Sequence, residues 1–214
     1  TGIEPETGGM TLRRFAPAAA GAALLLLAGC ASMGPGEQSA VPPAVSPAAP
    51  GTVVGQGTVL QIGDDAPQLC LGAIAESYPP QCTGPEIVGW NWDAIDIKET
   101  ANDVTWGTFA VFGTWDGATF AVTEDPVPLA LYDPMMSDPD PRLDPENAGE
   151  SSDAELRAIQ EVVTTDLPVD VLFSFSENGY LFVTVYYDDG SIQEFFDTVY
   201  GPDVVAVQSA LVAV

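Results

Sequence analysis

Apolar and polar residues alternate with a period of two along much of the chain between residues 57 and 131, a pattern typical of half-buried β-strands. Four extended runs stand out, at residues 58–62, 68–71, 86–90 and 104–123. The longest run turns at Asp116-Gly117, a dipeptide favoured in tight hairpins. About five strands fit a small barrel, so the pattern predicts an OB-like β-barrel over residues 57–132.

Beyond residue 150 the pattern predicts helices as well as strands. Ser152 and Glu155 form a capping box before apolar residues at helical spacing. Two apolar strands, 169–176 and 180–188, then meet at Asn178-Gly179, a hairpin signal.

The end of the chain predicts one more helix and one more strand. Ser191 and Glu194 form a second capping box, Gly201 is placed to end that helix, and residues 204–214 form the last strand. The order α-β-β-α-β over residues 151–214 predicts a small sheet with both helices on one face. The predicted fold class is therefore α+β.

Two proline-rich segments separate these patterns. Residues 30–56 are rich in Pro, Ala and Gly and predict an extended tether. Residues 133–150 alternate acids with prolines, and they predict an inter-domain linker without regular structure. An EF-hand in this linker is disfavoured because Arg142 and Leu143 stand where a ligand and a glycine are needed. The sequence therefore predicts no metal site.

The chain from Met10 carries the parts of a bacterial export signal. Arg13 and Arg14 form a charged start, an apolar run follows, and Leu27-Ala28-Gly29-Cys30 ends it. These last four residues resemble the lipobox of bacterial lipoprotein signal peptides. The resemblance implies that residues 1–29 are removed and that Cys30 is acylated, which anchors the protein on the outer face of the cytoplasmic membrane. The arginine pair leaves open whether export uses the general secretory or the twin-arginine route.

Two cysteines remain once Cys30 is committed to lipid. Cys70 and Cys82 form an even pair in an oxidising compartment, which predicts a disulfide. Their spacing excludes a CxxC redox or metal motif, and the sequence predicts no cofactor.

The loop between these cysteines contains a second short resemblance. Ser77-Tyr78-Pro79-Pro80-Gln81-Cys82 resembles the second half of the reactive loop of Bowman-Birk protease inhibitors. The resemblance implies that Glu76 is a specificity residue and that Ser77 follows the inhibited bond. The chain departs from that family by placing its first cysteine twelve positions before Cys82 and by lacking the family's other disulfides. The alternative is a proline-stiffened loop without inhibitory function.

Charge excludes several classes of function. The chain has 31 acidic residues against 5 basic ones and no histidine, which gives a net charge of −26. Binding a phosphate backbone needs clustered Lys and Arg, so nucleic acid is excluded. Catalytic sites that depend on imidazole are excluded as well. The anionic surface favours a weak association of divalent cations with residues 138–146 and with Asp188-Asp189.

Tryptophans gather in the first predicted domain. Trp90, Trp92 and Trp115 are candidate ligand-binding residues because exposed aromatic faces can hold sugars. The alternative is that they pack in the barrel core.

These observations favour a membrane-anchored extracytoplasmic lipoprotein that acts as a non-catalytic envelope binding or accessory module. Its expected partners are the lipid membrane, through acylated Cys30, and an envelope glycan or protein. No set of catalytic residues is identified. The alternative is an extracytoplasmic hydrolase with paired carboxylates, which would require a buried acid pair whose pKa values differ.

A broader resemblance covers most of residues 55–214. Its motifs are residues 57–61, 69–72, 77–84 and 106–117, with the closing stretches 200–205 and 209–211. These motifs resemble envelope lipoproteins of unknown function from actinobacteria. The resemblance implies no known activity.

Overall fold

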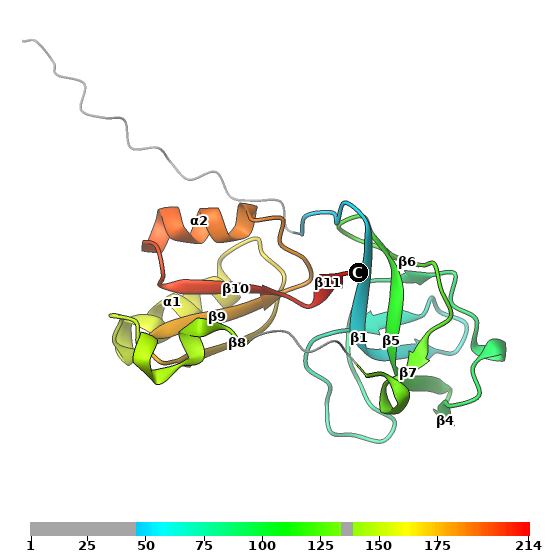
Figure 1. Cartoon of the computed structure of the whole chain (residues 1–214). Helices are drawn as coiled ribbons and strands as arrows, with labels where there is room; N and C mark the ends of the chain where they lie inside the picture. The colour runs from blue at the N-terminus through cyan, green and yellow to red at the C-terminus, as the bar shows by residue number, and fades with distance from the viewer. Residues whose placement is uncertain (1–45, 134–138) are drawn as a thin grey trace, which may run out of the picture. The chain divides into compact units, whose positions relative to one another are not determined.

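Two long antiparallel strands run side by side at the centre of the larger sheet (Figure 1). The computed structural model describes residues 46–133 and 139–214, so the signal segment, Cys30 and most of the tether lie outside the described residues. β1 (Thr52–Ile62) pairs with β5 (Val104–Trp115) along its whole length, from Thr52 opposite Thr114 to Ile62 opposite Val104. β1 therefore begins earlier than the predicted run at residues 58–62.

Six short strands complete a curled, mostly antiparallel sheet (Figure 1). Its order is β11-β1-β5-β6-β3, with β2 on β1 and with β4 and β7 on β5. The six are β2 (Gln68–Cys70), β3 (Ile87–Val88), β4 (Glu99–Ala101), β6 (Phe120–Val122), β7 (Val127–Pro128) and β11 (Leu211–Ala213). One-turn 3-10 helices lie at Trp92–Ala94 and Leu129–Leu131.

The predicted hairpin at Asp116-Gly117 is confirmed. Gly117 has a φ of +99°, a conformation that favours glycine. The Asp116 carboxylate accepts hydrogen bonds from the backbone N–H groups of Ala118 and Thr119 at 2.9 and 2.7 Å. The side chain therefore holds the turn that reverses β5 into β6.

The second half of the chain follows the predicted order of helices and strands, and the fold is α+β. The elements are α1 (Asp153–Thr165), β8 (Val171–Glu177), β9 (Tyr180–Val185), α2 (Ser191–Tyr200) and β10 (Val205–Ser209). The three strands form a separate sheet of order β10-β9-β8. Among the described residues, no helix is long and apolar enough to cross a bilayer.

One of the two predicted capping boxes is correct. Ser152 and Glu155 cap α1 reciprocally, as predicted. The box predicted at Ser191 and Glu194 is wrong, because Ser191 is already helical and the N-cap is Gly190. The Asp188 carboxylate instead accepts hydrogen bonds from the N–H groups of Gly190 and Ile192 at 3.0 and 2.9 Å. An acid upstream of the helix thus bonds an N–H group of the first turn, that of Ile192, which has no partner within the helix.

Both helices pack on one face of the small sheet. Leu181, Val183 and Val185 of β9 form a buried cluster with Leu156 of α1 and Phe196 of α2. The opposite face of β9 is aromatic, with Phe182 fully buried and its ring stacked on that of Phe175, their centroids 4.9 Å apart.

The acidic segment near this second face forms regular turns, contrary to the prediction. Two one-turn 3-10 helices, Pro141–Leu143 and Pro145–Asn147, follow one another. Each begins with proline after an aspartate, Asp140 or Asp144, whose side chain accepts the N–H two residues on. Aspartate at the N-cap and proline at the first helical position both favour a helix start, and so the prolines begin the turns instead of preventing them.

The last predicted strand divides in two. β10 pairs in parallel with β9, and β11 pairs in antiparallel with β1 in the other sheet. The chain changes partner at Ala210 and Leu211, whose N–H groups donate to the carbonyl oxygens of Val185 and Tyr186 at 2.9 Å each. All described residues fall in one compact unit. The predicted boundaries at residues 133 and 150 remain a prediction.

Candidate functional site

A groove of about 820 Å³ is the candidate functional site. Its walls come from both ends of the disulfide loop, from the turn after β5, and from the start of β8 together with Tyr186, which follows β9. Asp170 is the single charged residue among those that line it. In a chain with a net charge of −26, this groove is therefore a weakly charged surface.

Two aromatic side chains from different sheets meet at the groove. The ring centroids of Trp115 and Tyr186 lie 5.4 Å apart. Trp115 is only 3% exposed, and its indole N–H donates to the Ser46 hydroxyl at 3.3 Å. Tyr186 is half-buried. Burial, and then the nearby Asp170 carboxylate, raise the pKa of the Tyr186 phenol, so its hydroxyl stays protonated and can donate a hydrogen bond.

Two of the glycines that line the groove, Gly84 and Gly117, are tightly packed against other parts of the chain. A Cβ at Gly84 would overlap the carbonyl oxygen of Leu69, and a Cβ at Gly117 would lie 2.7 Å from the carbonyl oxygen of Ser46. Neither position has room for a side chain. Packing of the protein on itself therefore requires glycine at both positions.

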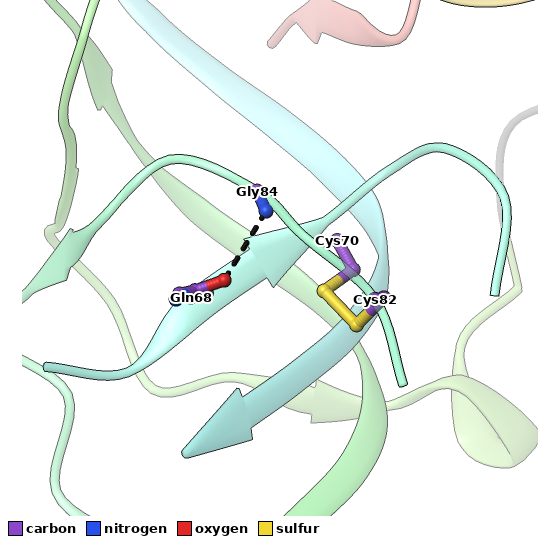
Figure 2. The surroundings of a disulfide bond; sticks show 4 residues. All are labelled: Gln68, Cys70, Cys82 and Gly84. Atoms are coloured by element: carbon purple, nitrogen blue, oxygen red, sulfur yellow. Dashed lines mark hydrogen bonds between the residues drawn. A yellow bond between two sulfur atoms is a disulfide. The ribbon is translucent and has the colours of Figure 1, made fainter. Parts of the chain in front are cut away.

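The predicted disulfide holds one wall of the groove. Cys70 and Cys82 are bonded, with their Cα atoms 6.1 Å apart. Figure 2 shows the bond beside the hydrogen bond from the Gly84 N–H to the Gln68 side-chain oxygen, which is 3.3 Å long. Together they join the strand that enters the loop to the segment that leaves it.

The rest of the disulfide loop is exposed and internally bonded. The Ala75 N–H donates to the Gln81 carbonyl at 2.9 Å, and the Ser77 hydroxyl donates to the Pro79 carbonyl at 2.9 Å. The Tyr78–Pro79 peptide bond is cis. Tyr78 is 71% exposed, and its ring meets Trp106 edge to face with centroids 5.4 Å apart. The loop thus has a defined conformation at the surface.

The three tryptophans predicted to bind a ligand all contact one core cluster. Trp115 belongs to that cluster, and Trp90 and Trp92 pack against it while remaining partly exposed. Trp115 lines the groove, whereas Trp90 lines a separate cavity of about 230 Å³. Of the three, Trp115 is the one that the fold brings to the groove.

Trp90 and Trp92 are held by aromatic contacts. Both rings pack around the fully buried Phe109, at centroid distances of 5.1 and 6.3 Å. They also meet each other at an interplanar angle of 77°. Both indole N–H groups are buried without a nitrogen or oxygen acceptor among the described residues. Neighbouring ring faces are weak acceptors, and edge-to-face packing of this kind is typical of an aromatic core.

The carboxylates with clearly shifted pKa values accept hydrogen bonds in turns and helix caps or take part in an ion pair. Backbone N–H groups lower the pKa of Asp116 and, with the Ser152 hydroxyl, that of Glu155. Arg142 lowers the pKa of Asp140, to which it is paired at 2.9 Å. Hydrogen bonds from Ser191 lower the pKa of Asp189. A general acid needs a raised pKa, the opposite direction.

A second cavity, of about 760 Å³, is lined by Glu150, Glu155 and Asp203. The Glu155 carboxylate accepts hydrogen bonds from the backbone N–H and the hydroxyl of Ser152 at 2.9 and 2.7 Å. Glu155 is therefore committed to capping α1. Within residues 46–133 and 139–214, no group of three acids or cysteines is arranged to hold a metal ion.

Comparisons with protein families, with curated proteins and with solved structures found no match to this chain. The site therefore rests on its own geometry. Tyr186 and Asp170 were not predicted as site residues. The one sequence signal that could have indicated them is the Tyr186-Tyr187 pair directly after a buried strand.

Proposed function

We propose that this protein is a membrane-anchored extracytoplasmic lipoprotein, acylated at Cys30, whose folded part is a non-catalytic envelope binding module. The observation that carries the proposal is the Cys70–Cys82 disulfide, because disulfides persist outside the reducing cytoplasm. The lipobox-like Leu27–Cys30 supplies the anchor. The resemblance to actinobacterial envelope lipoproteins agrees with this compartment.

The groove beside Tyr186 is the ligand site in this proposal, and its ligand is an uncharged envelope glycan. A half-buried aromatic ring, a hydroxyl donor and one carboxylate acceptor form the usual set for recognising sugar rings and hydroxyls. The net charge of −26 repels anionic wall polymers. The OB-like barrel is also a proposal, supported by the curled, mostly antiparallel larger sheet.

The carboxylate hydrolase is the less favoured alternative. The four carboxyl groups with clear shifts all have lowered pKa values. The single acid in the groove, Asp170, has no second carboxylate beside it among the lining residues. A retaining or inverting glycosidase needs two such groups facing one bond.

Anchoring is tested by membrane fractionation and labelling with a radioactive fatty acid. Cys30→Ala should lose the label and leave the membrane fraction, whereas the control Ser32→Ala should behave as the wild type. Equal labelling of the Cys30→Ala protein would refute acylation at this residue.

Glycan binding is tested by calorimetry on the full chain in detergent. The probes are uncharged N-acetylglucosamine oligomers and, as the anionic comparison, poly(glycerol phosphate). Tyr186→Ala should weaken binding of the uncharged probe about fivefold, because stacking on an aromatic ring contributes roughly 1 kcal/mol. The control Tyr132→Ala changes a tyrosine that packs on Phe112 and does not line the groove. Equal losses in both variants, or tighter binding of the anionic polymer, would refute the site.

A further inference from the structure

The outer edge of β10 faces away from the rest of the small sheet. β10 pairs in parallel with β9, and the Leu181 N–H donates to the Val204 carbonyl at 2.9 Å. Backbone groups alternate in direction along a strand. Since Val204 points its carbonyl at β9, the backbone groups of Val205 and Val207 point to the outer side.

A glutamine of α2 occupies this outer side. The Gln193 side-chain oxygen accepts from the Val207 N–H at 2.9 Å, and its nitrogen donates to the Val205 carbonyl at 2.8 Å. The second amide hydrogen is used as well, since the nitrogen also donates to the Asp197 carboxylate at 2.8 Å. One side-chain amide therefore bonds the same two backbone groups that a neighbouring strand would bond.

The other edge of the sheet shows a related contact. The Gln160 side-chain nitrogen, on α1, donates to the Ser174 carbonyl and hydroxyl of β8 at 3.1 and 2.9 Å. Each helix thus sends a glutamine to the edge strand beside it. The contact of Gln193 is the more complete, because it includes a donor and an acceptor of the strand.

The segment that Gln193 covers is prone to pair with other strands. Residues 204–214, Val-Val-Ala-Val-Gln-Ser-Ala-Leu-Val-Ala-Val, contain no charge, no proline and no glycine in a chain of net charge −26. Uncharged, β-branched segments of this kind with a free edge add further strands readily. The outer edge of β10 is the place where a strand would add.

We propose that the Gln193 side chain prevents a second copy of this chain from pairing with β10, because it occupies the backbone groups at the outer edge that an added strand would bond. The net charge also keeps copies apart, but it acts over a Debye length that shrinks to about 3 Å in 1 M salt. The glutamine contact is short-ranged and remains effective in salt. A second copy therefore stays excluded even where charge repulsion is screened.

The test compares Gln193→Ala with Gln208→Ala in the full chain, purified in detergent, in 0.1 and 1 M sodium chloride. Gln208 lies on β10 and makes no side-chain hydrogen bond among the described residues. Sedimentation velocity should show a monomer for the wild type and for Gln208→Ala in both salts. Gln193→Ala should associate in 1 M salt, with an average mass at least twice that of the monomer.

Hydrogen exchange at the Val207 amide separates edge pairing from a general loss of structure. In Gln193→Ala this amide should exchange roughly tenfold faster than in the wild type at low protein concentration, because its hydrogen bond is lost. Its protection should return as the protein associates. A variant that merely loosens the fold would not regain protection at this one position.

Gln193→Glu is the second variant, since it keeps an acceptor for the Val207 N–H, loses the donor to the Val205 carbonyl and to the Asp197 carboxylate, and adds a negative charge beside Asp197. It should associate less than Gln193→Ala and more than the wild type. A folded Gln193→Ala protein that remains monomeric in 1 M salt overturns the proposal, as does equal association of Gln208→Ala. Loss of the folded state in both Gln193 variants also overturns it, because the glutamine would then hold the sheet together.

Discussion

Asn178 connects the acidic turns to the small sheet, and replacing it is the most informative perturbation of this fold. Its side-chain nitrogen donates to the carbonyl oxygens of Arg142 and Asp144 at 2.9 and 2.7 Å. Its own carbonyl accepts from the Gly149 N–H at 2.8 Å. Asn178 also has a φ of +51° in the turn between β8 and β9. Asn178 therefore contributes both to the hairpin and to the attachment of residues 139–150, which the Tyr180 hydroxyl also bonds through the Asn147 carbonyl at 2.8 Å.

Two substitutions separate these roles. Asn178→Gly keeps the left-handed backbone and removes two side-chain hydrogen bonds, which should lower the free energy of unfolding by about 2 kcal/mol at about 1 kcal/mol each. Asn178→Ala also places a residue that tolerates the left-handed region less well than asparagine, which costs about 1 kcal/mol, so its loss should be about 3 kcal/mol. Asn102 is the matched control, because it is exposed and has a φ of +48°.

The assay is urea unfolding combined with hydrogen exchange at residues 142–149. Asn102→Gly should leave stability nearly unchanged, and Asn102→Ala should cost only the backbone term, about 1 kcal/mol. Exchange at Gly149 should rise in both Asn178 variants and in neither Asn102 variant. If Asn178→Gly is as stable as the wild type and Gly149 stays protected, the reasoning that these two hydrogen bonds hold the turns is refuted.

Three further predictions concern the disulfide and the charges. Replacing Cys70 and Cys82 by Ala should lower the free energy of unfolding by about 3 kcal/mol in urea, because the bond closes a loop with a sequence separation of 12; unchanged stability would contradict this. The stabilisation by Asp140 should be lost in acid: its lowered pKa, like that of Asp189, gives stability that is full above about pH 4 and lost as pH falls through the lower folded value, so Asp140→Asn should lower the melting temperature at pH 7 and not at pH 2. An equal loss at both pH values would contradict it. Calcium chloride and sodium chloride of equal ionic strength should stabilise equally, by screening; a calcium-specific rise that saturates would instead indicate a site.

Features set by a few adjacent residues could be predicted from the sequence. Asp116-Gly117 and Asn178-Gly179 form the predicted turns, because both need residues that tolerate a positive φ. The capping box at Ser152 is local in the same sense. At Asp116 and at Ser152 the side chain and the backbone group that it bonds lie within three residues of each other.

The predictions for the start of α2 and for the acidic turns are wrong because two local sequence signals compete at each place. Ser191 is a good N-cap residue, but Asp188 stands three residues before it, and the chain enters α2 through Gly190 at a φ of +99°. In this conformation the Asp188 carboxylate accepts from the N–H of Ile192 in the first turn. The acidic turns show a related competition: proline breaks a helix in its interior, but directly after an aspartate N-cap it begins one.

The groove could not be predicted, because its residues are far apart in the sequence. Tyr186 and Trp115 are 71 positions apart, and they meet because the chain after β9 passes to the larger sheet. The decisive contacts are backbone ones: Ala210 and Leu211 donate to Val185 and Tyr186, and β11 then pairs with β1. Residues 204–214 show no sequence signal of this change of partner, since all eleven are compatible with a single strand. Residues 204–214, which contain no charged residue, proline or glycine, therefore join the two sheets and bring Tyr186 to the groove. Because the same segment can pair with further strands, the outer edge of β10 needs the contact with Gln193.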